Sequence, residues 1–160
     1  MDNKIKAKIL KYIPYGLYVV TSISSDQLMK NAFSASWLTQ ISFKPPLLAL
    51  ASQEDSLSTK LILDSKKFVV NFVDESQSDI IKYFFTPAHK KDKISDHHWS
   101  FGKHTGCPIL DEGLAYLECL VRDSIALGDH TLIIGEIIDA VSLREGEPLH
   151  IRHTPWSYSG

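Results

Sequence analysis

The pattern of hydrophobic and polar positions predicts a protein built mainly of β-strands. Several segments are rich in β-branched and aromatic residues and are separated by short polar turns, which is typical of strands. The strands are expected at residues 15–24, 28–42, 47–52, 67–73, 114–127 and 130–143. The last two meet at Gly128-Asp129, and glycine followed by a polar residue suits a type II′ hairpin turn.

Three other segments have the spacing of short helices. Residues 2–11 form a basic amphipathic stretch, expected to be a helix that lies across the barrel formed by the strands. Ser56 is a suitable N-cap for a second helix, in which Leu57, Leu61 and Ile62 recur at helical spacing. Residues 76–85 suit a third helix. The inward-facing residues of this third helix are expected to be Ile80, Ile81, Phe84 and Phe85.

Strands without regularly alternating helices predict a single domain, residues 1–160, folded as a closed or partly closed antiparallel β-barrel. Residues 132–134 and 137–138 place hydrophobic side chains on both faces of one strand, which suggests an outer wall covered by helices or by a second subunit. Residues 86–113 form a long irregular connection, of a length typical of a functional cover or flap. No Gly-x-Gly-x-x-Gly motif follows a strand, so no separate nicotinamide-binding domain is expected.

Composition adds little beyond excluding some classes of protein. The chain has 160 residues, of which 44% are hydrophobic and 22% charged. Its net charge is only −2, so its overall electrostatic field does not attract it to nucleic acid or to a membrane surface. No apolar run reaches the ~20 residues that span a bilayer. The first residues lack a signal-peptide core, and a cytoplasmic location is expected. Cys107 and Cys119 do not have the spacing of a redox or zinc pair.

Residues 31–46 are the most informative segment. Asn31-Ala32-Phe33-Ser34-Ala35-Ser36-Trp37 combines small and hydroxyl-bearing side chains with one large aromatic ring. Small side chains leave the backbone open to close approach by something flat or anionic. Pro45-Pro46 then ends the strand, because proline cannot donate to a sheet ladder. The alternative is a barrel strand in which the small residues serve only close packing.

This segment, together with Ser-Phe-Lys-Pro-Pro at 42–46, resembles the flavin reductase-like family. Other family landmarks follow in the family's order. They are Phe-Val-Val-Asn at 68–71, Gly-Cys-Pro-Ile-Leu at 106–110, Leu-Glu-Cys at 117–119 and Gly-Asp-His-Thr at 128–131. The resemblance covers nearly the whole chain. It implies an FMN-binding split β-barrel that works as a homodimer and takes hydride from NADH or NADPH onto the flavin.

The family pattern also implies which residues bind the flavin. The expected contacts are Asn31, Ala32, Phe33, Ser34, Ala35, Ser36, Trp37, Ala51 and Ser52. Trp37 has the alternative role of packing in a dimer interface. A candidate for the phosphate site is Ser56, Ser58, Thr59 and Lys60, because hydroxyls and free N–H groups at a helix N-terminus attract anions. Glu54 and Asp55 oppose this electrostatically, and an ordinary helix cap is the alternative.

His130 matches the histidine of the family's Gly-Asp-His and is the candidate catalytic residue, placed to orient the ring or supply a proton. A solvated turn histidine is the alternative. His97, His98, His104 and Cys107 match no closed zinc pattern, so no metal site is expected. Asp111 and Glu112 would suit a carboxylate pair, but a turn before the next strand explains them. The terminal residues 154–160 contain two aromatics, which either fold back toward the flavin or pack in a dimer.

Two functions remain open from the sequence. One is an NAD(P)H-dependent FMN reductase. The other is a flavoredoxin-like electron-transfer module with permanently bound FMN, which the Asn-Ala-Phe-Ser-Ala-Ser-Trp-Leu-Thr-Gln run also resembles. A split-barrel protein that has lost flavin is a third reading, which the Asn31–Trp37 segment opposes. Expected partners are rubredoxin, a flavodiiron protein or a flavin-dependent oxygenase. No residue that would distinguish NADH from NADPH can be placed.

Overall fold

The computed structural model describes residues 1–86 and 92–156. Its α-helices are α1 (Asn3–Leu10), α2 (Leu57–Ser65) and α3 (Ser78–Phe84). Its strands are β1 (Tyr18–Ile23), β2 (Lys30–Ala35), β3 (Leu38–Ser42), β4 (Leu47–Gln53), β5 (Lys67–Phe72), β6 (Trp99–Phe101), β7 (Pro108–Leu110), β8 (Ala115–Leu127) and β9 (His130–Ser142). A 3₁₀ turn, η2 (Ile151–His153), follows. None of the helices in these ranges has the length and hydropathy to cross a membrane.

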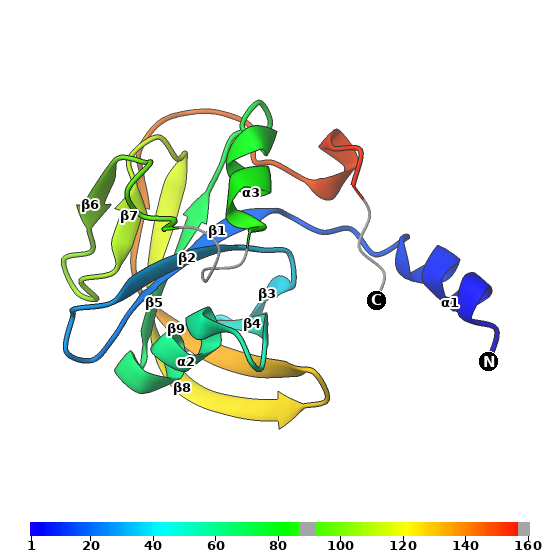
Figure 1. Cartoon of the computed structure of the whole chain (residues 1–160), viewed down its shortest axis with the longest axis horizontal. Helices are drawn as coiled ribbons and strands as arrows, with labels where there is room; N and C mark the ends of the chain where they lie inside the picture. The colour runs from blue at the N-terminus through cyan, green and yellow to red at the C-terminus, as the bar shows by residue number, and fades with distance from the viewer. Residues whose placement is uncertain (87–91, 157–160) are drawn as a thin grey trace.

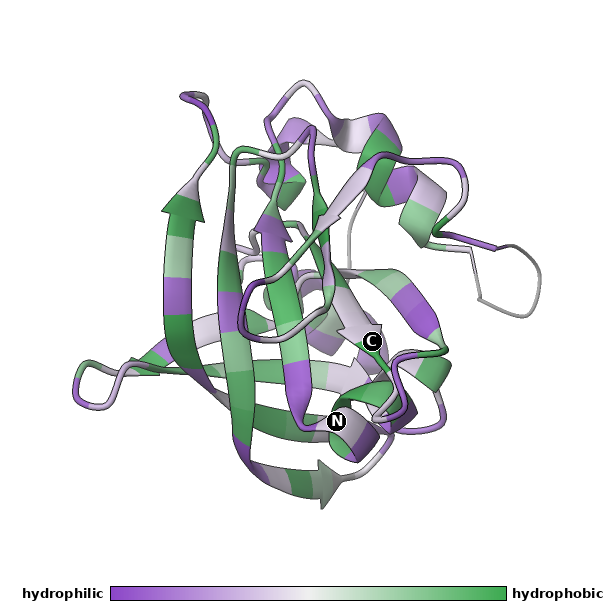
Figure 2. Cartoon of the chain, turned by 90° about the vertical axis from the view of Figure 1, so that its left-hand side faces the viewer, coloured by the Kyte–Doolittle hydropathy of each residue, from purple (hydrophilic) through white to green (hydrophobic). Residues whose placement is uncertain are grey.

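The main sheet has seven strands in the order β2-β1-β5-β8-β9-β4-β3, and all of its pairings are antiparallel. It curls strongly, and hydrophobic and polar residues alternate along several of its strands (Figure 2). A second sheet contains only β6 and β7. The expectation of a mainly β, antiparallel fold with a few short helices is confirmed. Gly128 has φ of 72°, as the first central residue of a type II′ turn requires.

The core lies inside the curl of the sheet. Phe68, Leu50 and Val20 are fully buried there, and Ile62 of α2 joins them. A second cluster under α3 contains Ile81, Phe84 and other buried residues. Strand β2 runs between the two helices, with α3 above it and α2 below it (Figure 1). Its alternate residues therefore pack on different helices, because side chains of a strand point to opposite faces.

The expected single strand at 28–42 is wrong, because the chain forms two strands separated by Ser36 and Trp37. Strand β2 pairs with β1 at one edge of the sheet, whereas β3 pairs with β4 at the other edge. The chain must pass from one edge to the other, so the ladder cannot continue through these two residues. The break places Ser36 and Trp37 between the two edges of the sheet.

Two expectations about helices need correction. Helix α1 forms close to its expected bounds, but it has no buried residue and stands away from the sheet rather than lying across it (Figure 1). In α3, Ile81 and Phe84 are buried as expected, whereas Phe85 is 52% exposed. The third difference concerns the 86–113 connection, which contains the short β6–β7 hairpin instead of being irregular throughout.

Candidate functional site

The start of α2 is held by a network of hydroxyl groups. Ser56 is the N-cap, as expected, and its Oγ accepts a hydrogen bond from the Thr59 amide at 3.1 Å. The Thr59 hydroxyl lies 2.7 Å from Oγ of Ser52 and 2.8 Å from the carbonyl oxygen of Gln53. Thr59 and Ser52 are buried. The network therefore fixes the end of β4 against the first turn of α2.

Strand β2 is joined to the same turn by one buried side-chain contact. The Asn31 amide donates to the Ser58 hydroxyl at 2.6 Å, and both side chains are almost completely buried. This bond brings together the two segments that the sequence assigned to flavin and phosphate. The first-turn N–H groups of Leu57 and Ser58 have no acceptor within the helix, which is the general property of a helix N-terminus.

Trp37 and His130 form the other half of the site. Their ring centroids are 4.8 Å apart with the planes inclined by 45°. The Trp37 carbonyl accepts a hydrogen bond from the Ala51 amide at 2.9 Å, and β4 places Gln53 opposite His130 in the ladder. His130 Nδ1 lies 2.7 Å from a carboxylate oxygen of Asp129. This hydrogen bond and the adjacent imidazole lower the pKa of Asp129 below its ordinary value.

The other residues of the expected flavin contact set lie on both faces of β2. Phe33 and Ala35 pack with the core inside the curl, whereas Ala32 belongs to the cluster under α3. The Ser34 hydroxyl donates to the Ile81 carbonyl in α3 at 2.6 Å. Any ligand contact by Ser34 is therefore expected from its backbone. Lys60 is exposed on α2, so its expected role at the phosphate remains a prediction.

These residues are compatible with a flavin mononucleotide in their chemistry. Hydroxyl and amide donors gather at the start of α2 and suit an anionic group. The neighbouring Trp37–His130 pair offers aromatic surface to a planar ring. Glu54 and Asp55 are both exposed beside the donors, and the Glu54 amide donates to the Asp129 carbonyl at 3.1 Å. The rim of the site is therefore acidic, as the sequence indicated.

Lys93 is a residue of this region that the sequence reasoning missed. Its side chain is only 5% exposed, and its Nζ donates to the carbonyls of Ala32 and Phe84, each at 3.1 Å. The ammonium thus ties β2 to the end of α3. Burial lowers the pKa of Lys93 to about 8, because a desolvated ammonium is unfavourable. Lysine is normally exposed, so its position in the sequence carried no signal.

One described histidine of the 86–113 connection, His97, contacts a carboxylate of the same connection. His97 Nδ1 lies 2.7 Å from a carboxylate oxygen of Glu112, and its ring lies among the rings of α3 and β6. Asp111 instead accepts from the amide of Ser100 at 2.9 Å. Asp111 and Glu112 therefore act on different parts of the connection and do not form a pair.

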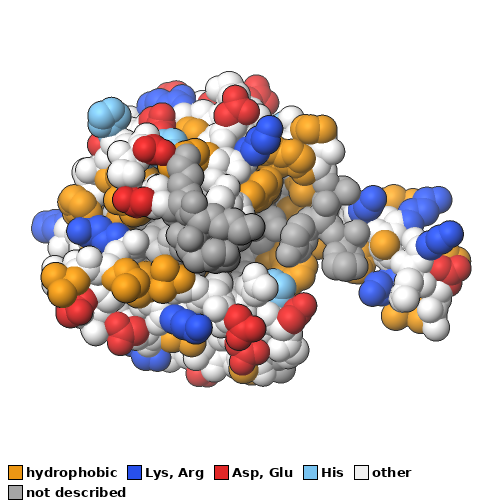
Figure 3. Space-filling view, viewed as in Figure 1, with side chains coloured by type: hydrophobic (Ala, Val, Ile, Leu, Met, Phe, Trp, Pro, Cys, Tyr) orange, Lys and Arg blue, Asp and Glu red, His pale blue; other side chains and the backbone are white. Residues whose placement is uncertain are grey.

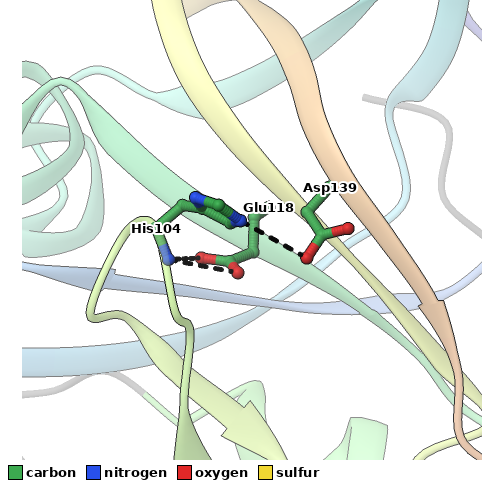
Figure 4. A group of neighbouring side chains, drawn as sticks. All are labelled: His104, Glu118 and Asp139. Carbon is green, nitrogen blue, oxygen red and sulfur yellow. Dashed lines mark hydrogen bonds and ion pairs between the residues drawn. The ribbon is translucent and has the colours of Figure 1, made fainter.

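His104, Glu118 and Asp139 bring possible metal-ligand atoms within 4.8 Å of one another (Figure 4). Glu118 is fully buried, and its carboxylate accepts from the amide of Thr105 at 2.7 Å and from that of His104 at 3.1 Å. It also accepts from the Thr105 hydroxyl at 2.7 Å. These bonds tie Oε2 of Glu118 to the turn that carries His104 and Thr105, while Oε1 has a longer contact of 3.4 Å to the His104 amide. We assign the carboxylate to anchoring that turn.

The described part of the C-terminal segment packs near α3. The Trp156 ring lies 5.0 Å from that of Phe85, centroid to centroid, in an edge-on arrangement. Its expected partner was the flavin or a second subunit, and both remain predictions. Residues 157–160 lie outside the described residues.

Comparison with known proteins identifies the family of the chain. Residues 10–154 match the model of the flavin reductase like domain. A probable flavin reductase of Rhizobium meliloti is 33% identical over 76% of this chain and 38% of its own length. A high molecular weight rubredoxin of Moorella thermoacetica is 30% identical over 89% of this chain and 62% of its own. The chain thus spans roughly two fifths to three fifths of the length of these two relatives.

Among solved structures, the flavin reductase HpaC complexed with NADP⁺ superimposes with a TM-score of 0.81 at 26% identity. The match covers 99% of both chains. The family model, the curated relatives and the solved structure all lead to the same assignment, and the motifs at 31–37, 68–71, 106–110 and 128–131 lie within the matched range. The chain belongs to the flavin reductase-like domain family.

Proposed function

We propose that this chain binds FMN at the site described above and catalyses its reduction by NADH or NADPH. One observation carries the proposal: side chains from five separate segments of the chain converge on one region. They are Asn31, Trp37, Ser52, Ser56 and His130. The family assignment supports a flavin as the ligand. The solved relative in complex with NADP⁺ supports a nicotinamide donor.

The chain's own residues would divide the work as follows. The start of α2 would hold the phosphate with Ser56, Ser58 and first-turn amides, because hydroxyls and N–H groups are suitable anion donors. Trp37 and His130 would flank the ring and exclude water. Bound FMN would supply the hydride-accepting chemistry. His130, held through Nδ1 by Asp129, would keep Nε2 available to orient the ring or exchange a proton.

A bulky side chain at the break between β2 and β3 tests the location of the site. Ser36 lies between the two strands and beside Trp37, so Ser36→Phe is expected to weaken FMN binding by about tenfold or more. The control is Ser142→Phe, an exposed serine at the far end of β9 from His130, which should leave the affinity unchanged. FMN titration followed by flavin fluorescence measures both. Equal affinities of Ser36→Phe and the parent chain would place the flavin elsewhere.

A second candidate is an electron-transfer module with permanently bound FMN. It is favoured by the match to a high molecular weight rubredoxin. A rubredoxin or a flavodiiron protein would then collect the electrons, whereas a flavin-dependent oxygenase would suit a reductase that releases reduced flavin. Gel filtration after reduction separates the two: retained flavin favours the module, and released flavin favours the reductase.

We also propose that the chain works as a homodimer. Ile41, in the edge strand β3, is 49% exposed, and Phe43, in the turn that follows this strand, is 85% exposed. An exposed edge strand with large apolar residues beside it is a surface that proteins usually cover. A second copy would cover this edge next to Trp37.

A further inference from the structure

Helix α1 has an apolar face that no other described residue of its own chain covers. Ile5 and Ile9 lie one turn apart, on the same face, and are 57% and 55% exposed. Asp2 caps the helix, with Oδ1 accepting from the Lys4 amide at 2.8 Å. Met1 and Tyr12 extend the exposed apolar surface at either end. Figure 3 shows the helix at one end of the molecule, apart from the body formed by the other described residues.

An eight-residue helix is too short to be stable in water by itself, so it requires a surface to pack on. Charge indicates what kind of surface this is. Residues 1–11 contain four lysines and one aspartate and carry +3, and because the whole chain carries −2, the remaining residues carry −5. The segment is therefore electrostatically complementary to the body of its own protein.

We infer that α1 packs on the body of a second copy of this chain, and that the two copies exchange these helices. Exchange of an identical element is a common route to a symmetric dimer, and each copy supplies both a basic arm and an acidic receptor. Ile5 and Ile9 provide the buried contact, while the flanking lysines pair with exposed carboxylates of the partner. This deepens the homodimer proposed above and does not depend on flavin binding.

Zero-length cross-linking of lysines to carboxylates tests the exchange. Equal amounts of ¹⁵N-labelled and unlabelled protein are unfolded together, refolded and treated with a carbodiimide. Peptide pairs that join Lys4, Lys6 or Lys8 to a carboxylate of the body are then identified by mass spectrometry. Exchanged arms predict mixed-isotope pairs as abundant as same-isotope pairs. Same-isotope pairs alone would overturn the inference, because the arm would then pack on its own chain.

Variants show whether the apolar face is responsible. Ile5→Glu combined with Ile9→Glu is expected to lower the yield of these pairs by about tenfold. Leu28→Glu, the same kind of change at an 85% exposed leucine in the β1–β2 turn, should leave the yield unchanged. A dimer in sedimentation without any α1–body pair would overturn the exchange while leaving the dimer intact. Binding of α1 to anionic vesicles without such pairs would overturn it too and assign the helix to a lipid surface.

Discussion

At the scale of single residues, the contact between Trp37 and His130 depends on hydrogen bonds made elsewhere. Trp37 is positioned through its carbonyl by the Ala51 amide, and His130 is positioned by its place opposite Gln53 in the β4–β9 ladder. Asp129 then holds Nδ1 of the imidazole at 2.7 Å. The orientation of both rings thus follows from backbone pairing plus one carboxylate. In the proposed site, the ring nitrogen Nε2 would be the atom that faces the flavin.

His130→Ala is expected to slow the reduction of bound flavin by roughly 100-fold, the lower range for loss of a positioned acid–base group. The side chain touches the proposed ring position, so FMN affinity should also fall. This fall should be smaller than that of the rate constant, because other residues of the site still hold the flavin. Anaerobic stopped-flow measurement of flavin bleaching gives the rate constant at saturating FMN. His153→Ala, which removes a histidine near Glu75, is the control. A rate constant unchanged by His130→Ala would remove this residue from the mechanism.

Lys93 makes the folded protein sensitive to alkaline pH in a defined direction. Its pKa is about 8 in the folded protein and near 10.5 when unfolded. Between these values the unfolded chain binds more protons, so the free energy of unfolding contributed by this group rises with pH and is smallest below pH 8. At about 1.4 kcal/mol per pKa unit, the difference between about 8 and 10.5 corresponds to a rise on the order of 3 kcal/mol.

Urea unfolding of the parent chain and of Lys93→Met, at pH values on either side of that window, measures this rise. Other titrating groups are common to both proteins and cancel in the difference. The stability of the parent relative to Lys93→Met should therefore increase from pH 7.5 to pH 10.5. A difference that stays constant or decreases would show that the ammonium is not desolvated in the folded state.

At the scale of elements, the first turn of α2 has both a structural and a binding role in our account. Ser56→Ala removes the N-cap acceptor of Thr59 and is expected to cost about 1 kcal/mol in the free energy of unfolding. It should also weaken binding of FMN more than binding of riboflavin, which has no phosphate. Urea unfolding and paired titrations with the two flavins measure these effects. Equal losses for FMN and riboflavin would contradict a phosphate site at this turn.

The elements that the sequence predicted correctly are those set by local chemistry. The strand at 67–73 follows from its β-branched and aromatic residues, and the α2 cap follows from a serine placed before helical spacing. The break at Ser36-Trp37 could not be predicted, because no Gly or Pro marks it in residues 28–42 and it arises from pairing at opposite edges of the sheet. Lys93 was missed because its burial depends on the distant carbonyl of Ala32.

At the scale of the whole molecule, the curl of the seven-stranded sheet assembles the site. It brings β2 at one edge near the end of β4, the start of β9 and the start of α2, so that distant segments meet. The amphipathic pattern of residues 2–11 indicated that one face of α1 needs a cover, but not which surface supplies it. A second copy that covers β3 and receives α1 would complete the apolar surfaces that one chain leaves exposed.

The most direct test of the account is the visible spectrum of the purified protein with FMN, recorded without oxygen while NADH and then NADPH are added. We predict that FMN binds and that at least one of the two donors bleaches the band of oxidised flavin much faster than it bleaches free FMN. Failure to bind FMN, or bound flavin that only a chemical reductant bleaches, would contradict a flavin reductase.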